Sequence, residues 1–340
     1  MYNSHYTMPP PPVPLRTEAS IYHSVNYDKK TPIKLMRQVT NGIGIGMTLL
    51  WVSSLDLSFS VMGLPQWFQR FYSDFNIATL VDGIVYSISF LLAYFIIRAT
   101  VAIPGHFALP WEKVDTRLSV FAVGFGLGCS YLGSFLTQML NAAITALTGY
   151  EATMPETETP ESALGWVLYF ISIAILPAMF EEMVFRGVVL QSLRQFGDRF
   201  AVFASALIFA LAHGNLIQGP NTFIMGIVLA SLVIYTGSMK IGILLHFCNN
   251  FFFSLIGAAD DLSGGLPDAI YYVIAFAIFA VGVMGLAGIL TRYSGVFGWS
   301  RGNYLLGGLQ KALHLLTTPM MLLYILICIL VIALYFVPAA

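Results

Sequence analysis

Residues 166–186 read WVLYFISIAILPAMFEEMVFR, an apolar run that ends with two adjacent carboxylates and an arginine. A helix that crosses a bilayer needs about 20 predominantly apolar residues, so this run predicts a membrane span. Inside a span, each charged side chain costs on the order of 2.5–3.5 kcal/mol to insert. Because a membrane helix rarely keeps such residues without a use for them, Glu181 and Glu182 are the first candidates for chemistry.

The composition of the whole chain is that of a polytopic membrane protein. Its 340 residues are 57% hydrophobic and 10% charged, whereas about 25% of the residues of a soluble domain are charged. The three cysteines lie in apolar stretches and fit neither a disulfide framework nor zinc-knuckle spacing. The net charge of −1 gives no sign of a nucleic-acid partner. We therefore expect an all-α, polytopic transmembrane helix bundle in a lipid bilayer.

Apolar runs predict about eight to nine spans, joined by short polar connections. They lie near residues 42–63, 77–98, 118–148, 164–186, 200–217, 221–237, 241–258, 269–290 and 318–338. The first is the least apolar, because it carries Asp56 and several glycines. The mixed stretch 292–316, with Trp299 and Lys311, predicts an interfacial segment.

These runs divide the chain into four regions. Residues 1–40, which include the proline run 9–12, predict a solvated cytoplasmic tail. Residues 41–150 hold the N-terminal transmembrane helices, and residues 259–340 hold the C-terminal helices with the interfacial segment. Residues 151–258 form the core that carries the motifs described below.

The distribution of lysine and arginine predicts an orientation. With the N-terminus in the cytoplasm, fifteen of the sixteen basic residues fall on the cytoplasmic side, and only Arg70 falls outside. Cytoplasmic loops of membrane proteins carry such an excess of basic residues. We therefore expect an integral membrane protein with a cytoplasmic N-terminus and an extracytoplasmic loop at 150–163.

The polar residues inside the spans fall into pairs that share a helix face, because their members are four positions apart. The pairs are Glu182 with Arg186, Phe209 with His213, and His246 with Asn250. A helix turns by about 100° per residue, so Glu181 points away from Glu182. Glu182 can therefore pair with Arg186 while Glu181 faces a cavity. Asp56 and Asp82 match no such pair and are interpreted as structural or water-facing.

Three motifs on successive spans, Glu-Glu-x-x-x-Arg, Phe-x-x-x-His and His-x-x-x-Asn, resemble those of the CAAX protease and bacteriocin-processing (CPBP or Abi) family. These intramembrane endopeptidases are related to the type II CAAX prenyl proteases. The resemblance covers about residues 164–255. It implies hydrolysis of a peptide bond in a peptide or a membrane-adjacent protein. In a bacterium this would be leader- or signalling-peptide processing or bacteriocin immunity, and in a eukaryote prenyl-protein processing.

The resemblance also implies roles for the paired residues. Glu181 is the general base that activates water, and His213 helps to hold that water. His246 and Asn250 offer N–H donors to the oxyanion, while Glu182 and Arg186 orient the helix and tune Glu181. Phe209 is expected to pack beside His213. Pro177, four residues before Glu181, is expected to kink the helix and free a carbonyl near the site.

Three questions stay open on the sequence alone. Glu181, His213 and His246 match the ligand inventory of a catalytic zinc site, so a divalent metal such as zinc stands beside the metal-free mechanism of a glutamate-activated water. There is, however, no His-Glu-x-x-His motif. A proton-coupled transporter also uses intramembrane Glu and His as relays, although no repeat between the two halves supports it. A non-catalytic scaffold of the same fold is the third alternative.

Overall fold

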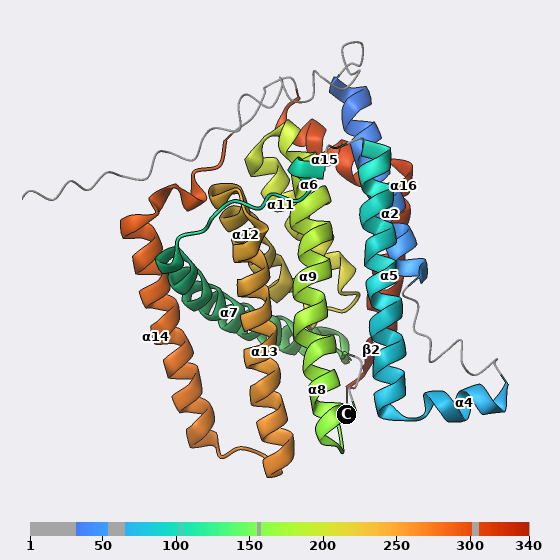
Figure 1. The fold of residues 1–340 in the computed structure, drawn as a ribbon, viewed down its shortest axis with the longest axis vertical. Helices are drawn as coiled ribbons and strands as arrows, with labels where there is room; N and C mark the ends of the chain where they lie inside the picture. The colour runs from blue at the N-terminus through green and yellow to red at the C-terminus, as the bar shows by residue number, and fades with distance from the viewer. Residues whose placement is uncertain are drawn as a thin grey trace, which may run out of the picture.

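A computed structural model describes residues 32–53, 65–101, 103, 105–154, 158–300 and 306–339. Most of the predicted tail, and Asp56, lie outside these residues. The described chain is a bundle of helices (Figure 1). The prediction of an all-α, polytopic bundle is confirmed.

The main helices follow one another along the chain with short connections between them. They are α2 (Pro32–Ser53), α4 (Gln66–Tyr72), α5 (Phe75–Val101), α6 (Gly105–Ala108), α7 (Thr116–Thr148), α11 (Asp198–Ala212), α12 (Gly219–Thr236), α13 (Met239–Ser263), α14 (Asp268–Arg292), α15 (Gly308–Thr317) and α16 (Pro319–Leu334). Between α7 and α11 a single continuous helical stretch, 163–196, passes through the middle of the molecule (Figure 1).

Every predicted span overlaps a helix, but fewer of these helices meet the requirements of a full span. Within the described residues, six helices are long and apolar enough to cross a membrane, or seven if the bent pair α15–α16 counts as one span. The 15 residues of α11 extend only about 22 Å, which is less than the hydrocarbon core of about 30 Å. The α15 and α16 axes meet at 71°.

One boundary differs from that expected. Helix α2 begins at Pro32, so residues 32–40, which the composition assigned to the tail, are helical. Proline is well accommodated at the first position of a helix, and Met36 and Val39 are fully buried in the core. Within the predicted interfacial stretch, the buried Lys311 donates from Nζ to the carbonyl of Phe196, while Leu309 and Leu313 are exposed.

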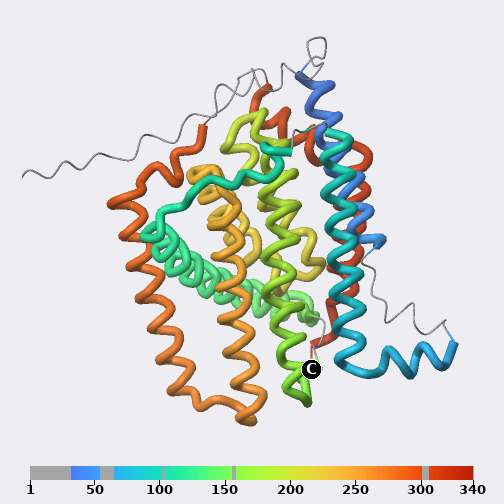
Figure 2. The backbone as a smooth tube through the Cα atoms, viewed as in Figure 1, coloured from blue at the N-terminus to red at the C-terminus, as the bar shows by residue number. Residues whose placement is uncertain are grey.

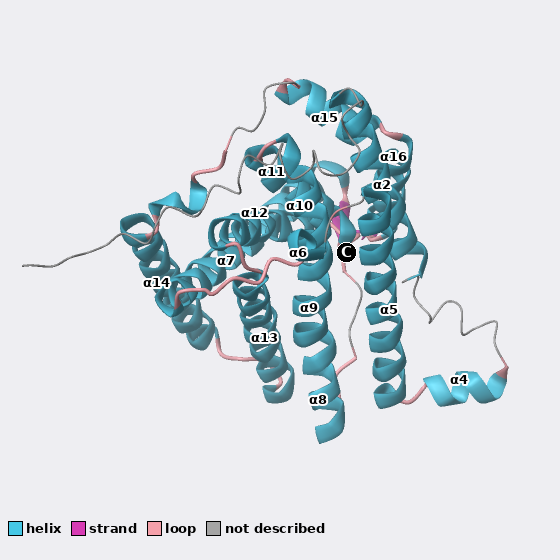
Figure 3. Cartoon of the chain, turned by 45° about the horizontal axis from the view of Figure 1, so that its top comes forward, coloured by secondary structure: helices cyan, strands magenta, loops and turns pink. Residues whose placement is uncertain are grey.

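The helices form two groups with the stretch 163–196 between them. Helices α2, α5 and α16 lie on one side, and α7, α13 and α14 lie on the other, as the turned view also shows (Figure 3). Helix α7 runs obliquely across the bundle (Figure 2). It approaches α14 so closely that a Cβ atom on Gly128 would lie 2.7 Å from the Cα of Gly282. Small residues at such crossings let membrane helices pack backbone to backbone.

A short two-stranded sheet joins distant parts of the chain. Strand β1 (Tyr150–Ala152) pairs antiparallel with β2 (Phe336–Pro338), and Tyr150 lies opposite Pro338. The connection that leads from α7 into the central helical stretch is therefore tied to the segment that follows α16.

We propose that the N-terminus is cytoplasmic and that the connection between α7 and the central helical stretch is extracytoplasmic, because of the distribution of basic residues. In a variant without the native cysteines, a cysteine at the exposed Glu161 position is expected to react with an impermeant maleimide in intact cells. A cysteine at the exposed Lys113 position should react only after permeabilisation. The reverse pattern of labelling would contradict this orientation.

Candidate active site

The two adjacent glutamates end a short α-helical segment that is flanked by wider π-helical turns. The central stretch consists of α8 (Ala163–Phe170), η1 (Ile171–Ile175), α9 (Leu176–Glu182), η2 (Met183–Val189), α10 (Leu190–Leu193) and η3 (Arg194–Phe196), with η1 and η2 in π conformation. Its first turn is capped by Ser162, whose hydroxyl accepts a hydrogen bond from the Gly165 backbone N–H at 3.0 Å. π-Helical turns inside α-helices occur frequently at functional sites.

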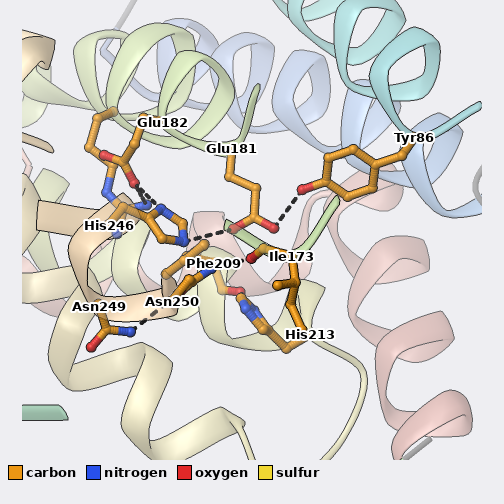
Figure 4. A network of polar contacts seen from close by, with 10 residues as sticks. Tyr86, Ile173, Glu181, Glu182, Phe209, His213, His246, Asn249 and Asn250 are labelled. Atoms are coloured by element: carbon orange, nitrogen blue, oxygen red, sulfur yellow. Dashed lines mark hydrogen bonds and ion pairs between the residues drawn. The ribbon is translucent and has the colours of Figure 1, made fainter. Parts of the chain in front are cut away.

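Glu182 is fully buried and lies between an arginine and a histidine. Its Oε1 atom is 2.9 Å from the Arg186 guanidinium and 2.9 Å from His246 Nδ1 (Figure 4). The ion pair expected from the spacing of four is therefore present, and the contact with His246 on α13 adds to it. Because a carboxylate only accepts hydrogen bonds, Nδ1 is the protonated nitrogen of His246.

Arg186 is also buried, and it lies against an aromatic face. Its guanidinium carbon is 4.1 Å from the centre of the Phe209 ring, within the range of a cation–π contact. The same ring meets His213 edge to face at 4.8 Å and His246 at 5.9 Å. The predicted packing of Phe209 beside His213 is confirmed, and Phe209 also contacts Arg186 and His246.

Glu181 uses its two carboxylate oxygens differently. Oε1 accepts a hydrogen bond from the Tyr86 hydroxyl at 2.7 Å. Oε2 lies 3.7 Å from His246 Nε2 and has no hydrogen-bond partner among the described residues. Glu181 is therefore held at one oxygen, while its other oxygen is buried beside His246 Nε2 without a hydrogen-bond partner among the described residues.

His213 is positioned by the end of α11. Its Nδ1 lies 2.9 Å from the Phe209 carbonyl, four residues earlier, so Nδ1 carries the proton and Nε2 is the free nitrogen of the neutral ring. The chain then turns at Gly214, whose φ of +63° favours glycine. A Cβ atom at Gly214 would lie 2.5 Å from the Trp51 ring of α2, so this turn also fits closely against its neighbour.

Asn250 reaches the carbonyl that Pro177 leaves without a helical donor. Proline has no N–H, so the carbonyl of Ile173, four residues before Pro177, lacks its usual partner. The Asn250 side-chain amide donates to this oxygen at 3.1 Å, and Asn249 donates to Asn250 Oδ1 at 3.2 Å. The carbonyl of Ile173 that Pro177 frees therefore lies near the site, as the sequence predicts. The amide of Asn250 has a second N–H, which remains for another acceptor.

Tyr86 is the residue of this cluster that sequence reasoning missed. It belongs to α5, outside the three motifs, and it is 95 positions from Glu181. A weak signal was available, since Tyr86 is four residues after Asp82 and shares a helix face with it. A tyrosine in an apolar span does not by itself indicate a site, because aromatic residues are common there.

Asp82 has a structural partner of its own. It accepts a hydrogen bond from the Tyr72 hydroxyl of α4 at 2.6 Å, which supports its structural interpretation. It also lines a cavity of about 260 Å³ between α5 and the start of the central stretch. The other lining residues are Phe75, Thr79, Glu158, Tyr169, Ser172 and Ile173. Ile173 belongs both to this cavity and to the contact with Asn250.

The side chains do not assemble an obvious metal site. Among the described residues, no three His, Cys, Asp or Glu side chains lie close enough together to hold a metal ion. The orientation of each histidine is compatible with ligation, since His213 and His246 both have Nδ1 occupied, as metal-binding histidines usually do. The expected trio of Glu181, His213 and His246 is therefore not grouped as a ligand set in this structure.

Gly242 on α13 has no side chain, and the Glu182 carboxylate lies in the space that a larger residue would fill. Substitution of Gly242 therefore tests the position of this carboxylate. A Cβ atom at Gly242 would lie 2.7 Å from Glu182 Oε2. Gly242→Ala is expected to displace this carboxylate from His246 and Arg186 and to lower the free energy of unfolding by about 1–3 kcal/mol. Thermal unfolding in detergent measures this change. In the matched control Gly257→Ala on the same helix, a Cβ atom would meet nothing within 4 Å. Equal stability of the two variants would contradict this account.

The comparisons with known proteins agree with this geometry. Residues 163–252, which contain all three motifs, match the family model described as type II CAAX prenyl endopeptidase, Rce1-like. The chain is also similar to the membrane-embedded CAAX protease MroQ of Staphylococcus aureus (strain USA300). The two are 27% identical over 157 residues, which are 44% of this chain and 58% of that protein. No solved structure gives a significant match.

The resemblance inferred from the three motifs is confirmed over nearly the same residues as expected. The matched segment is similar to an endopeptidase family, and the apolar helices indicate an integral membrane protein. The match begins at α8 and ends within α13, so α2, α5, α7, α14 and α16 lie outside it. Tyr86 is therefore contributed by a part of the chain that the family model does not cover.

Proposed function

We propose that this protein is an intramembrane endopeptidase that hydrolyses a peptide bond with a water activated by Glu181. The observation that carries the proposal is the geometry of Glu181. One oxygen is fixed by Tyr86, and the other faces His246 Nε2 at 3.7 Å with no hydrogen-bond partner among the described residues. The match of residues 163–252 to an endopeptidase family supports the same reaction.

In the proposed reaction, Glu181 Oε2 takes a proton from the water as the water oxygen attacks the scissile carbonyl carbon. The carbonyl π electrons move onto its oxygen, and the second N–H of Asn250 donates to this oxyanion. His246 Nε2 also donates when its ring carries both protons. Collapse of the intermediate breaks the C–N bond, and the proton on Glu181 passes to the leaving nitrogen. The carboxylate of Glu181 is thereby restored.

The remaining residues support this chemistry in the proposal. His213 helps to hold the water through Nε2, because its Nδ1 is engaged by the Phe209 carbonyl. Glu182 holds His246 in one orientation, and Arg186 compensates the charge of Glu182. Residues of the chain carry every step of this reaction.

The proposed substrate is a peptide or the membrane-adjacent tail of a protein. The relative in Staphylococcus aureus is described as a CAAX protease, and the matched family is described as a prenyl endopeptidase. For this chain we propose processing of a leader or signalling peptide, or bacteriocin immunity, if its source is bacterial. A eukaryotic source would instead favour a prenylated protein tail.

The experiment is cleavage by the purified protein in detergent, with products identified by mass spectrometry. The substrates are prenylated CAAX peptides, the same peptides without the lipid, and hydrophobic leader peptides. Parallel reactions contain a metal chelator, with and without added zinc. We expect cleavage that a chelator does not abolish. Loss of cleavage that zinc restores would show that a metal takes part. Proton uptake by proteoliposomes, without any cleavage, would favour the transporter.

A further inference from the structure

Tyr86 is the side chain that links Glu181 to a helix outside the matched family segment. Helix α5 lies beside the central stretch, and Tyr86 points from it toward Glu181 (Figure 4). The distance between Tyr86 Oη and Glu181 Oε1 is 2.7 Å, which is typical of a strong O–H···O hydrogen bond. The carboxylate only accepts, so the hydroxyl is the donor.

The Tyr86 ring is held by its neighbours so that the hydroxyl has a fixed direction. Phe90, four residues later on α5, lies 4.5 Å from it between ring centres. Phe90 in turn meets Phe185 edge to face at 6.4 Å, one turn beyond Glu181. Phe185 then meets Phe209 at 4.9 Å. This row of aromatic rings joins α5 to the motif residues on the other helices.

We infer that Tyr86 is a positioning residue that fixes the plane of the Glu181 carboxylate, so that the oxygen it does not bind is presented for catalysis. Its hydroxyl occupies Oε1 and stops the carboxylate from rotating, so that Oε2 stays opposite His246 Nε2. Without the hydroxyl, the carboxylate plane turns more freely about the terminal bond of Glu181, which has broad, roughly two-fold preferences, so an oxygen lies opposite His246 Nε2 for less of the time. This inference rests on the proposed function, because it assigns a role within that reaction.

Removal of the Tyr86 hydroxyl has a different effect if this group serves only as a hydrogen-bond donor to a buried carboxylate. A structural hydrogen bond would affect stability, and it would change turnover only through the amount of folded protein. A positioning residue acts on the chemical step, so it changes kcat at constant folded concentration and leaves KM unaffected. The two roles are therefore separated by kinetics measured on folded protein.

The test is Tyr86→Phe, which removes one oxygen atom and keeps the ring. We expect kcat per folded enzyme to fall about 10- to 100-fold, the range for loss of a hydrogen bond to a charged group, while KM stays near that of the wild type. The matched control is Tyr94→Phe on the same helix, since Tyr94 is buried two turns away and outside the site. Incorporation of 3-fluorotyrosine at position 86 keeps the donor and should retain the wild-type kcat.

A spectroscopic measurement separates failure of this inference from failure of the proposed function. The infrared carboxyl band that disappears in Glu181→Gln is expected to shift in Tyr86→Phe and to stay in place in Tyr94→Phe. This readout needs no substrate. An unchanged kcat in Tyr86→Phe, or a band that does not move, would overturn the positioning role. Absence of cleavage by the wild type, together with the shifted band, would instead overturn the proposed reaction and leave the contact established.

Discussion

Glu181→Gln is expected to lower kcat by about 10²- to 10⁴-fold, the usual contribution of a general base. Glutamine has nearly the same size as glutamate, and its amide oxygen can still accept the hydrogen bond from Tyr86. It cannot take a proton from water at neutral pH. Because the base acts in the transition state, substrate binding and the fold should be retained. The measurement is the cleavage rate of matched, folded preparations.

Further substitutions make this prediction specific. His213→Ala and His246→Ala should each also lower kcat strongly, but combining either with Glu181→Gln should add little, since residues that act as one unit are not additive. The control is Asp82→Asn on α5, which keeps an acceptor for Tyr72 and should cleave at nearly the wild-type rate. Near-normal cleavage by Glu181→Gln would remove the proposed mechanism and favour the transporter or the scaffold.

Arg186→Ala is expected to lower both the stability and the activity of the protein. The ion pair of Arg186 with Glu182 is buried on both sides, with exposed fractions of 1% and 0%. Removing one partner of such a pair costs about 3–5 kcal/mol, because it leaves an uncompensated charge in the interior. The Phe209 ring also loses the guanidinium that lies on it. Thermal unfolding in detergent and the yield of folded protein measure this loss.

A surface arginine provides the control for Arg186→Ala. Arg199 is the second residue of α11 and is exposed, so Arg199→Ala should leave stability nearly unchanged. Arg186→Lys keeps the charge but lacks the planar group that covers Phe209, so we expect it to recover only part of the stability. A stable and fully active Arg186→Ala protein would show that the pair supports neither the fold nor the site.

Features that depend on a single helix follow from the amino-acid sequence alone. Glu182 pairs with Arg186 and Phe209 contacts His213 because residues four positions apart share a helix face. The carbonyl that Pro177 frees is also a local consequence, since proline always removes the donor to the residue four positions earlier. The membrane spans were predicted for a similar reason, because the bilayer itself selects long apolar runs.

Packing between the helices sets which of them meet and which atoms face each other. His246 binds Glu182 through Nδ1, so only its Nε2 faces Glu181. The spacing of residues along α13 could not show this. Tyr86 reaches Glu181 from a helix 95 positions away, and Lys311 turns inward to the Phe196 carbonyl. Such contacts depend on which helices are neighbours and on how each helix is rotated about its axis. Packing sets both through many small interactions between helices, and no local sequence pattern encodes them.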